Sequence, residues 1–291
     1  MMDKRRQLGF TLVEMIVVIV ITGIIGGVVA IFLRMPVQGY VDSARRAEMT
    51  DIADTALRRI SRDLRLALPN SVRVTGTCGG TSTCFIEFIP TIGGGRYRDS
   101  TDSLGAGNVL DFSAADTSFD VLGTMQPGVP AVGDQIVVYN LGILGADAYT
   151  GNTLAADNRR AVSGVAGNVI SITSTAKLPF DSCQYDASGY VIGGCRFQVV
   201  QTPVTYACAP AVGGSGGTLT RWQGYPIQPG QPITPPGGTS SIMATNVSAC
   251  SFTYDASVVA QRSGLVTMHL TITEQGESAS LYGATHVSNL P

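Results

Sequence analysis

The sequence contains few charged residues, and their balance is slightly acidic. Asp, Glu, Lys and Arg together make up 14% of the 291 residues, and the formal net charge is -2. From Pro69 to the C-terminus there are nine basic and fourteen acidic residues, a net charge of -5. Proteins that bind nucleic acid need a basic surface against the phosphates. The sequence therefore predicts no nucleic-acid partner.

Patterns that carry common catalytic chemistry are also scarce. There are only two histidines, His269 and His286, and no phosphate-binding loop or dinucleotide-binding motif. Gly213 to Gly217 matches GxSxG, but a nucleophile elbow needs a strand before it and a helix after it, and the flanking residues here predict a loop and a strand. We therefore predict that the chain is not an enzyme and holds no cofactor.

A calcium site is a minor alternative to the absence of any cofactor. The aspartates between Asp99 and Asn108 are spaced somewhat like those of a calcium-binding loop. The segment lacks the full alternating ligand set and the terminal bidentate glutamate of such a loop. An ordinary polar loop is the favoured interpretation.

Cysteine is absent from the first 77 residues; six cysteines follow, and none forms a CxxC pair. Zinc sites usually need such short spacings, whereas an exported protein enters an oxidising compartment where disulfides form. Disulfides are therefore favoured over a metal site. We expect these pairings: Cys208 with Cys250 between two strands, Cys183 with Cys195 around a hairpin, and Cys78 with Cys84 around a short loop.

The N-terminal part contains a long apolar run with a single charge. From Phe10 to Leu33 the only charged residue is Glu14, and as a helix these residues extend about 36 Å, enough to cross a hydrocarbon core of about 30 Å. Lys4, Arg5 and Arg6 precede the run, which predicts a cytoplasmic amino terminus and an exported remainder. The alternative is a conventional secretory signal that leaves Ile31 as the first residue.

A conventional signal leaves Glu14 unexplained. A carboxylate in the bilayer costs about 2.5 to 3.5 kcal/mol, so it needs a function and a partner. No nearby side chain is basic. A cut between Gly9 and Phe10 would create a positively charged α-amino group one helical turn away. The sequence therefore predicts that proteolysis supplies the partner of Glu14.

The residues around this bond resemble a known signature. The segment GFTLVE, Gly9 to Glu14, is similar to the signature of type IV prepilins and type II secretion pseudopilins. The resemblance implies that a prepilin peptidase cleaves after Gly9 and methylates the amino group of Phe10. It also implies that Glu14 pairs with the terminal amine of a neighbouring subunit during assembly. The implied partners are the inner membrane, the peptidase, other major and minor pilins and an assembly platform protein.

Beyond the apolar run the pattern becomes amphipathic and then β-rich. Pro36 predicts a kink, and apolar residues then recur at helical spacing up to Leu68, with Asp54–Arg58 and Arg59–Asp63 as expected ion pairs on the polar face. After Pro69, short runs rich in β-branched residues predict strands. The expected fold class is α+β, with the long helix packed against an antiparallel β-rich head. The expected parts are a leader (1–9), the assembly helix and stalk (10–68) and the head (69–291).

A narrower resemblance comes from the head. Segments such as VGDQIVVYNLG, LTRWQGYPI and GLVTMHLTIT are similar to those of MshO-type minor pilins of the MSHA pilus system. This implies a structural subunit that helps to initiate a pilus, anchored first in the inner membrane with its head in the periplasm. The bulky head suggests a scarce subunit near the pilus tip. The alternatives are a tip adhesin, a minor pseudopilin of a type II secretion system and a secreted enzyme.

Overall fold

The structure is a computed structural model, and it divides into two units, residues 1–49 and 50–291. Lys4, Arg5 and Arg6 of the expected leader lie outside the described residues, and only the backbone is described for Met35 and Gln126. The described residues are 9–79, 82–126, 128–150, 157–174, 176–235, 237–256 and 263–291.

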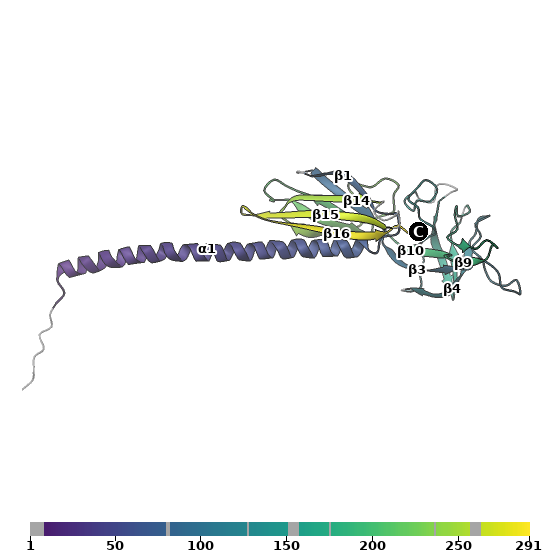
Figure 1. The fold of residues 1–291 in the computed structure, drawn as a ribbon, viewed down its shortest axis with the longest axis horizontal. Coiled ribbons are helices and arrows are strands. Elements are labelled where there is room, and N and C mark those ends of the chain that lie inside the picture. Colours follow the sequence, from purple (N-terminus) through teal and green to yellow (C-terminus); the bar gives the residue numbers. More distant parts are fainter. Residues whose placement is uncertain are drawn as a thin grey trace, which may run out of the picture. The chain divides into compact units, whose positions relative to one another are not determined.

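One helix, α1 (Leu12–Leu64), accounts for the whole N-terminal pattern. It is long and apolar enough to cross a membrane, and its most apolar 18-residue window is 0% buried. The helix continues through Pro36, so the expected kink does not interrupt its assignment as a single element. The long helix is visible in Figure 1.

The end of α1 belongs to the second unit and contributes to its core. Ala53, Ala56, Ile60 and Leu64 are each at most 1% exposed, which confirms the apolar face predicted from their spacing. Two backbone hydrogen bonds between residues three apart tighten the chain after the helix, from Leu66 to Asp63 and from Ala67 to Leu64.

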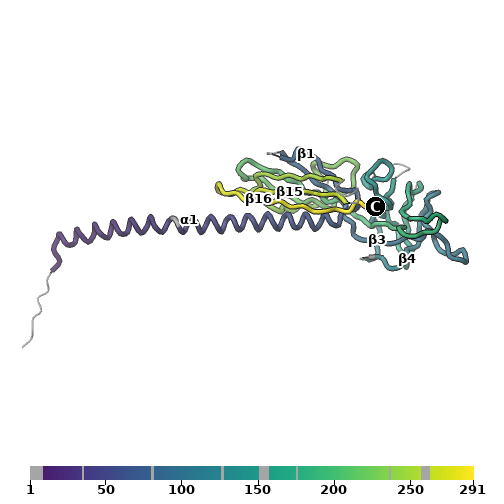
Figure 2. Tube along the Cα trace, viewed as in Figure 1, coloured from purple at the N-terminus to yellow at the C-terminus, as the bar shows by residue number. Residues whose placement is uncertain are grey.

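Two antiparallel sheets pack with this part of the helix. The first has the strand order β1-β2-β11-β12-β13, and the second has the order β14-β15-β16; Figure 2 shows β15 and β16 running beside the end of α1. Strand β16 approaches the helix where Gly283 faces Leu57. The strands are β1 (Arg73–Gly79), β2 (Ser82–Phe88), β11 (Val204–Ala209), β12 (Thr218–Gln223), β13 (Thr239–Thr245), β14 (Val247–Asp255), β15 (Ser263–Glu274) and β16 (Glu277–Ser288).

The inner faces of these sheets follow the alternation of the sequence. In β15, Val266, Met268, Leu270 and Ile272 are at most 2% exposed, as their period of two predicts. The disulfide between Cys208 in β11 and Cys250 in β14 joins the two sheets. The observed framework confirms the expected α+β class.

A second substructure, a closed barrel, was not predicted. Its strand order is β10-β3-β4-β7-β6-β5, and its core is a separate cluster that includes Tyr97, Phe119 and Phe197, each at most 1% exposed. A two-stranded sheet, β8-β9, lies between β7 and β10 in the sequence. The strands are β3 (Thr91–Tyr97), β4 (Ser118–Gln126), β5 (Gln135–Val137), β6 (Arg159–Ala166), β7 (Val169–Ile172), β8 (Gln184–Tyr185), β9 (Val191–Gly193) and β10 (Arg196–Val200).

The barrel is an insertion between two neighbouring strands of the first sheet. Strand β2 precedes it and β11 follows it, and these strands pair directly, with Phe88 opposite Val204. A smaller buried cluster that includes Leu68, Ile89 and Val200 joins the barrel to the segment after the helix. The chain therefore leaves the helix-bound sheet, completes the barrel and returns beside its point of departure.

Candidate functional site

The candidate site is the beginning of α1, where Thr11 caps the helix. The backbone N–H of Glu14 donates to the Thr11 hydroxyl at 3.3 Å, and the N–H of Met15 donates to the Thr11 carbonyl at 3.2 Å. The first bond satisfies a donor that has no acceptor within the helix, and the second is the first regular hydrogen bond of the helix. Glu14 lies in the first turn, where the helix dipole favours a negative charge.

The role of Thr11 is the part of this site that the sequence interpretation missed. Thr11 and Glu14 have the Thr-x-x-Glu spacing of a capping box, in which a threonine starts the helix and a glutamate lies three residues later. That spacing was a detectable signal. Only the Thr11 half of such a box forms in the described structure, because the backbone N–H of Glu14 is bonded to the Thr11 hydroxyl and its carboxylate is not bonded to the Thr11 N–H.

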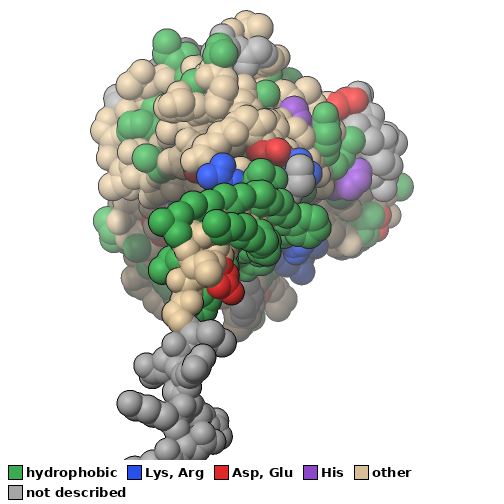
Figure 3. Space-filling view, turned by 90° about the vertical axis from the view of Figure 1, so that its left-hand side faces the viewer, with side chains coloured by type: hydrophobic (Ala, Val, Ile, Leu, Met, Phe, Trp, Pro, Cys, Tyr) green, Lys and Arg blue, Asp and Glu red, His purple; other side chains and the backbone are tan. Residues whose placement is uncertain are grey.

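The surroundings of Glu14 are apolar and open. The side chains of Phe10 and Leu12 are 79% and 76% exposed, and exposed apolar residues continue to Leu33. Figure 3, seen toward the N-terminal end of the helix, shows this dense gathering of hydrophobic side chains. Within the described residues, no hydrogen bond or ion pair engages the Glu14 carboxylate. The structure thus leaves this carboxylate available to a partner outside the chain.

Gly9 and Phe10, the expected cleavage residues, precede the helix without regular secondary structure. An ideal Cβ at Gly9 would meet no atom within 4 Å. A peptidase needs an accessible backbone at the bond it cuts. The geometry at Gly9 and Phe10 is compatible with that requirement.

A buried ionic network in the head was not anticipated. Glu87 in β2 has a fully buried side chain and pairs with Arg73 at 2.7 Å, and it also accepts a hydrogen bond of 2.9 Å from the hydroxyl of Tyr225. Burial raises the pKa of Glu87 above its ordinary value of 4.5, and the hydrogen bond from Arg73 opposes that shift. Arg73 also lies 3.6 Å from the ring centroid of Tyr149. The network links strands of the first sheet to the barrel insertion.

The cysteines form two disulfides and leave two thiols. Cys183–Cys195 and Cys208–Cys250 are bonded, as expected, but Cys78 and Cys84 are free, which differs from the expected third bond. Cys84 lies opposite Gly76 in the β1–β2 hairpin instead of opposite Cys78. The Cys78 sulfur accepts the backbone N–H of Phe252. Cys78 nevertheless remains a neighbour of Cys84, since a hydrogen bond between the two thiols helps to raise the pKa of Cys84.

The remaining sequence candidates lie apart from one another. The GxSxG match occupies the connection between β11 and β12, so a strand and not a helix follows it. In the weak calcium pattern, one carboxylate oxygen of Asp102 accepts the backbone N–H groups of Leu104 and Ala106. Over the part of the chain that the structure describes, no group of three or more His, Cys, Asp or Glu residues is arranged to hold a metal ion.

A comparison with family models bears directly on the start of α1. Residues 4–30 match the prokaryotic N-terminal methylation motif. The match includes Gly9, Phe10, Thr11 and Glu14. No curated protein and no solved structure gives a significant match to the chain.

The methylation motif supports a type IV pilin-like or pseudopilin subunit. It implies processing by a prepilin peptidase and assembly with other pilins and with membrane machinery. The apolar helix that follows fits a pilin anchored in the inner membrane. The motif family is structural and not enzymatic.

Proposed function

We propose that this chain is a minor pilin of an MSHA-like type IV pilus, a structural subunit that helps to initiate fibre assembly. The observation that carries the proposal is Glu14, a lone acid in the first turn of an exposed apolar helix and within the methylation motif. Cleavage after Gly9 frees the amino group of Phe10, which the peptidase then methylates. Glu14 neutralises the corresponding amine of a neighbouring subunit as the helix leaves the bilayer.

In this proposal the amino terminus starts in the cytoplasm and the head in the periplasm. The processed subunit then occupies a position near the tip, because a large head is poorly suited to every position of a thin fibre. The similarity of head segments to MshO-type pilins supports the MSHA assignment, and a minor pseudopilin of a type II secretion system is the neighbouring alternative. Isolation of the chain with secretion-system pseudopilins instead of pili would favour that alternative.

The first peptide of the native protein tests the proposal. Mass spectrometry should identify N-methyl-Phe10 as the amino-terminal residue. An unmodified terminus at Ile31 would instead identify a conventional secreted protein and reject a pilin.

A variant tests the role of the charge separately from processing. Glu14→Val should still enter the membrane and be cleaved, but it should be depleted from sheared fibres. Thr22→Val is the matched control, because its hydroxyl is bonded within the helix to the Val18 carbonyl. Normal incorporation of Glu14→Val would contradict the proposed charge pair.

A tip adhesin is the second candidate function, and the barrel inserted between β2 and β11 favours it. The barrel adds an outer surface beyond the helix and its two sheets, and the buried cluster that includes Leu68, Ile89 and Val200 joins it to the segment after the helix. Saccharide binding by the purified full chain would support an adhesin. Recovery of the barrel only in contact with sibling pilins would count against it.

A further inference from the structure

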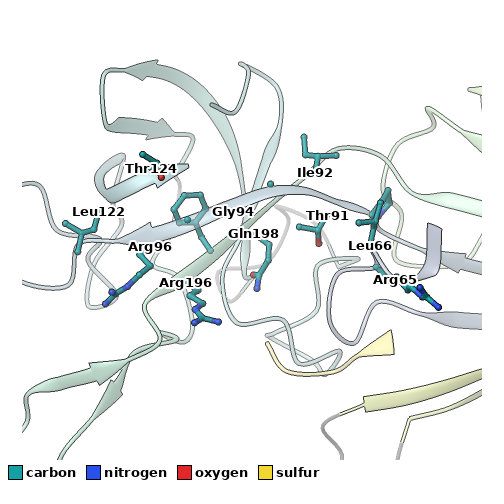
Figure 4. Close-up of a pocket in the computed structure, with 15 residues that line it drawn as sticks. Arg65, Leu66, Thr91, Ile92, Gly94, Arg96, Leu122, Thr124, Arg196 and Gln198 are labelled. Atoms are coloured by element: carbon teal, nitrogen blue, oxygen red, sulfur yellow. The ribbon is translucent and has the colours of Figure 1, made fainter. Parts of the chain in front are cut away.

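A shallow groove crosses the outer face of the barrel. Its volume is about 920 Å³, and it extends over β3 from the segment after α1 to the neighbouring strands β4 and β10. Figure 4 shows this region. The middle of β3 is Gly93–Gly95, so backbone forms the floor of the groove.

Two arginines meet at one end of this groove. Arg96 in β3 and Arg196 in β10 are direct cross-strand partners. The neighbouring residues Tyr97 and Cys195 form a hydrogen-bonded pair, in which the Tyr97 N–H donates to the Cys195 carbonyl. Arg96 and Arg196 therefore occupy a non-hydrogen-bonded position, where opposing side chains are closest. Figure 4 shows both side chains extending toward the lower side of the view, Arg96 to the left and Arg196 downward.

The arginine pair has no counter-charge in the described structure. Both side chains are exposed, no described residue forms an ion pair with either, and no acidic residue lines the groove. Like charges placed directly opposite each other destabilise a sheet. Guanidinium groups on directly opposite residues suit a carboxylate, which can accept hydrogen bonds from both.

The remaining lining indicates what carries that carboxylate. Ile92, Leu122 and Leu66 offer apolar side chains beside the glycine floor, whereas the one aromatic lining residue, Phe197, is 1% exposed and cannot stack on a sugar ring. The seven residues of β3 extend over about 23 Å, the length of an extended peptide of similar size. The side-chain amide oxygen of Gln198 is buried and has no hydrogen-bond partner among the described residues. Rotation of this amide toward a bound peptide backbone would therefore cost no described hydrogen bond at that oxygen.

We propose that this groove docks an extended acidic segment of a partner protein, with an Asp or Glu carboxylate between Arg96 and Arg196. Apolar side chains of the segment then cover Ile92 and Leu122. The charge of the groove contrasts with the acidic balance of the rest of the head and selects against basic segments. The inference does not depend on the pilin assignment, because it uses only contacts of the barrel and the segment after α1.

A labelled peptide tests this proposal directly. The probe is a fluorescein-labelled peptide of alternating Asp and Val residues, and its binding to the purified full chain in detergent is measured by fluorescence anisotropy. We expect saturable binding that weakens by about tenfold in Arg96→Ala and in Arg196→Ala. Added salt should weaken it further. The same peptide with Lys in place of Asp should not bind.

Lys177→Ala is the matched control, because it removes an exposed positive charge of the same substructure outside the groove. It should bind the acidic peptide as the unmodified chain does, and thermal unfolding should show that all the variants are folded. Equal binding of the Lys peptide, or no loss in either arginine variant, would overturn the proposal. Tighter binding of oligogalacturonate than of the acidic peptide would also overturn it and assign the groove to an acidic saccharide.

Discussion

The Asp63 carboxylate in the last turn of α1 accepts a hydrogen bond of 2.7 Å from the Tyr206 hydroxyl in β11. The same carboxylate oxygen pairs with Arg221 in β12 at 2.9 Å. These contacts fix the end of the helix against two strands of the first sheet. They replace the expected pair between Arg59 and Asp63, because a partly buried partner from a strand competes with a solvated one on the helix.

Asp63→Asn should destabilise the second unit. Hydrogen bonds to charged groups contribute about 1.5 to 3 kcal/mol, and the variant weakens two of them. We expect the free energy of unfolding of the full chain in detergent to fall by about 2 kcal/mol, measured by urea unfolding with the fluorescence of the single tryptophan, Trp222. Asp54→Asn is the control, because its exposed pair with Arg58 contributes only about 0.3 to 0.5 kcal/mol. Equal effects of the two variants would show that Asp63 does not anchor the helix.

Glu87 should make stability fall as the pH rises. Its pKa is raised above 4.5 in the folded state by burial, so above that pH the folded protein retains a proton that the unfolded chain releases. The free energy of unfolding therefore decreases from about pH 4.5 upward through the folded-state pKa. Glu87→Gln should abolish this contribution, which urea unfolding at a series of pH values would detect. If the difference in the free energy of unfolding between Glu87→Gln and the unmodified chain stayed constant across that pH range, it would contradict the protonation of Glu87 in the folded protein.

Four cysteines lie on strands of the two sheets, Cys78, Cys84, Cys208 and Cys250. Their different bonding states predict which of them an alkylating reagent modifies. Cys84 is 0% exposed, burial raises its pKa, and it lies directly opposite Cys208 on β11. Iodoacetamide should therefore leave Cys84 unmodified in the folded chain. After unfolding without a reductant, mass spectrometry should find two modified cysteines, Cys78 and Cys84. Absence of modification at both would establish the third disulfide that the sequence predicted.

The arginine pair of the barrel predicts a stabilising substitution. Arg196→Gln removes the repulsion with Arg96 and should raise the free energy of unfolding by about 0.2 to 1 kcal/mol at low salt. Arg96→Gln should raise the free energy of unfolding similarly. Relief of the repulsion should stabilise the double variant no more than it stabilises either single variant, because one substitution is enough to remove the repulsion. Thermal unfolding of the four proteins completes this cycle. Additive gains would show that the two guanidinium groups do not interact.

Helix α1 and strand β15 could be predicted because their apolar residues recur at a regular spacing along one continuous segment of the sequence. The buried face of α1 follows its three- and four-residue spacing, and β15 alternates apolar and polar residues over most of its length. At the start of α1, a lone acid shortly after the expected cleavage bond is likewise a local pattern. A family model that matches residues 4–30 detects the same short segment.

The barrel could not be predicted in this way, for two reasons. Strand β3 contains three consecutive glycines, which have low strand propensity and no side chain to show alternation. The closure of the barrel depends on pairs such as Phe197 with Gly95, about a hundred residues apart in the sequence. Strand β16 was missed for a related reason, since Glu277–Ser288 is rich in small and polar residues. Its strand conformation comes from pairing with β15, which its composition does not indicate.

The position of the barrel between β2 and β11 makes it an exchangeable cassette. Its two ends meet at one cross-strand pair, Phe88 and Val204, so a short turn can connect the same strands when the cassette is removed. A replacement at this junction has to cover the side chains of Leu68 and Ile89, which now pack with Val200, and to supply a partner for Arg73 in place of Tyr149. A graft that meets these two requirements would give the chain a new surface while α1 and its two sheets stay unchanged.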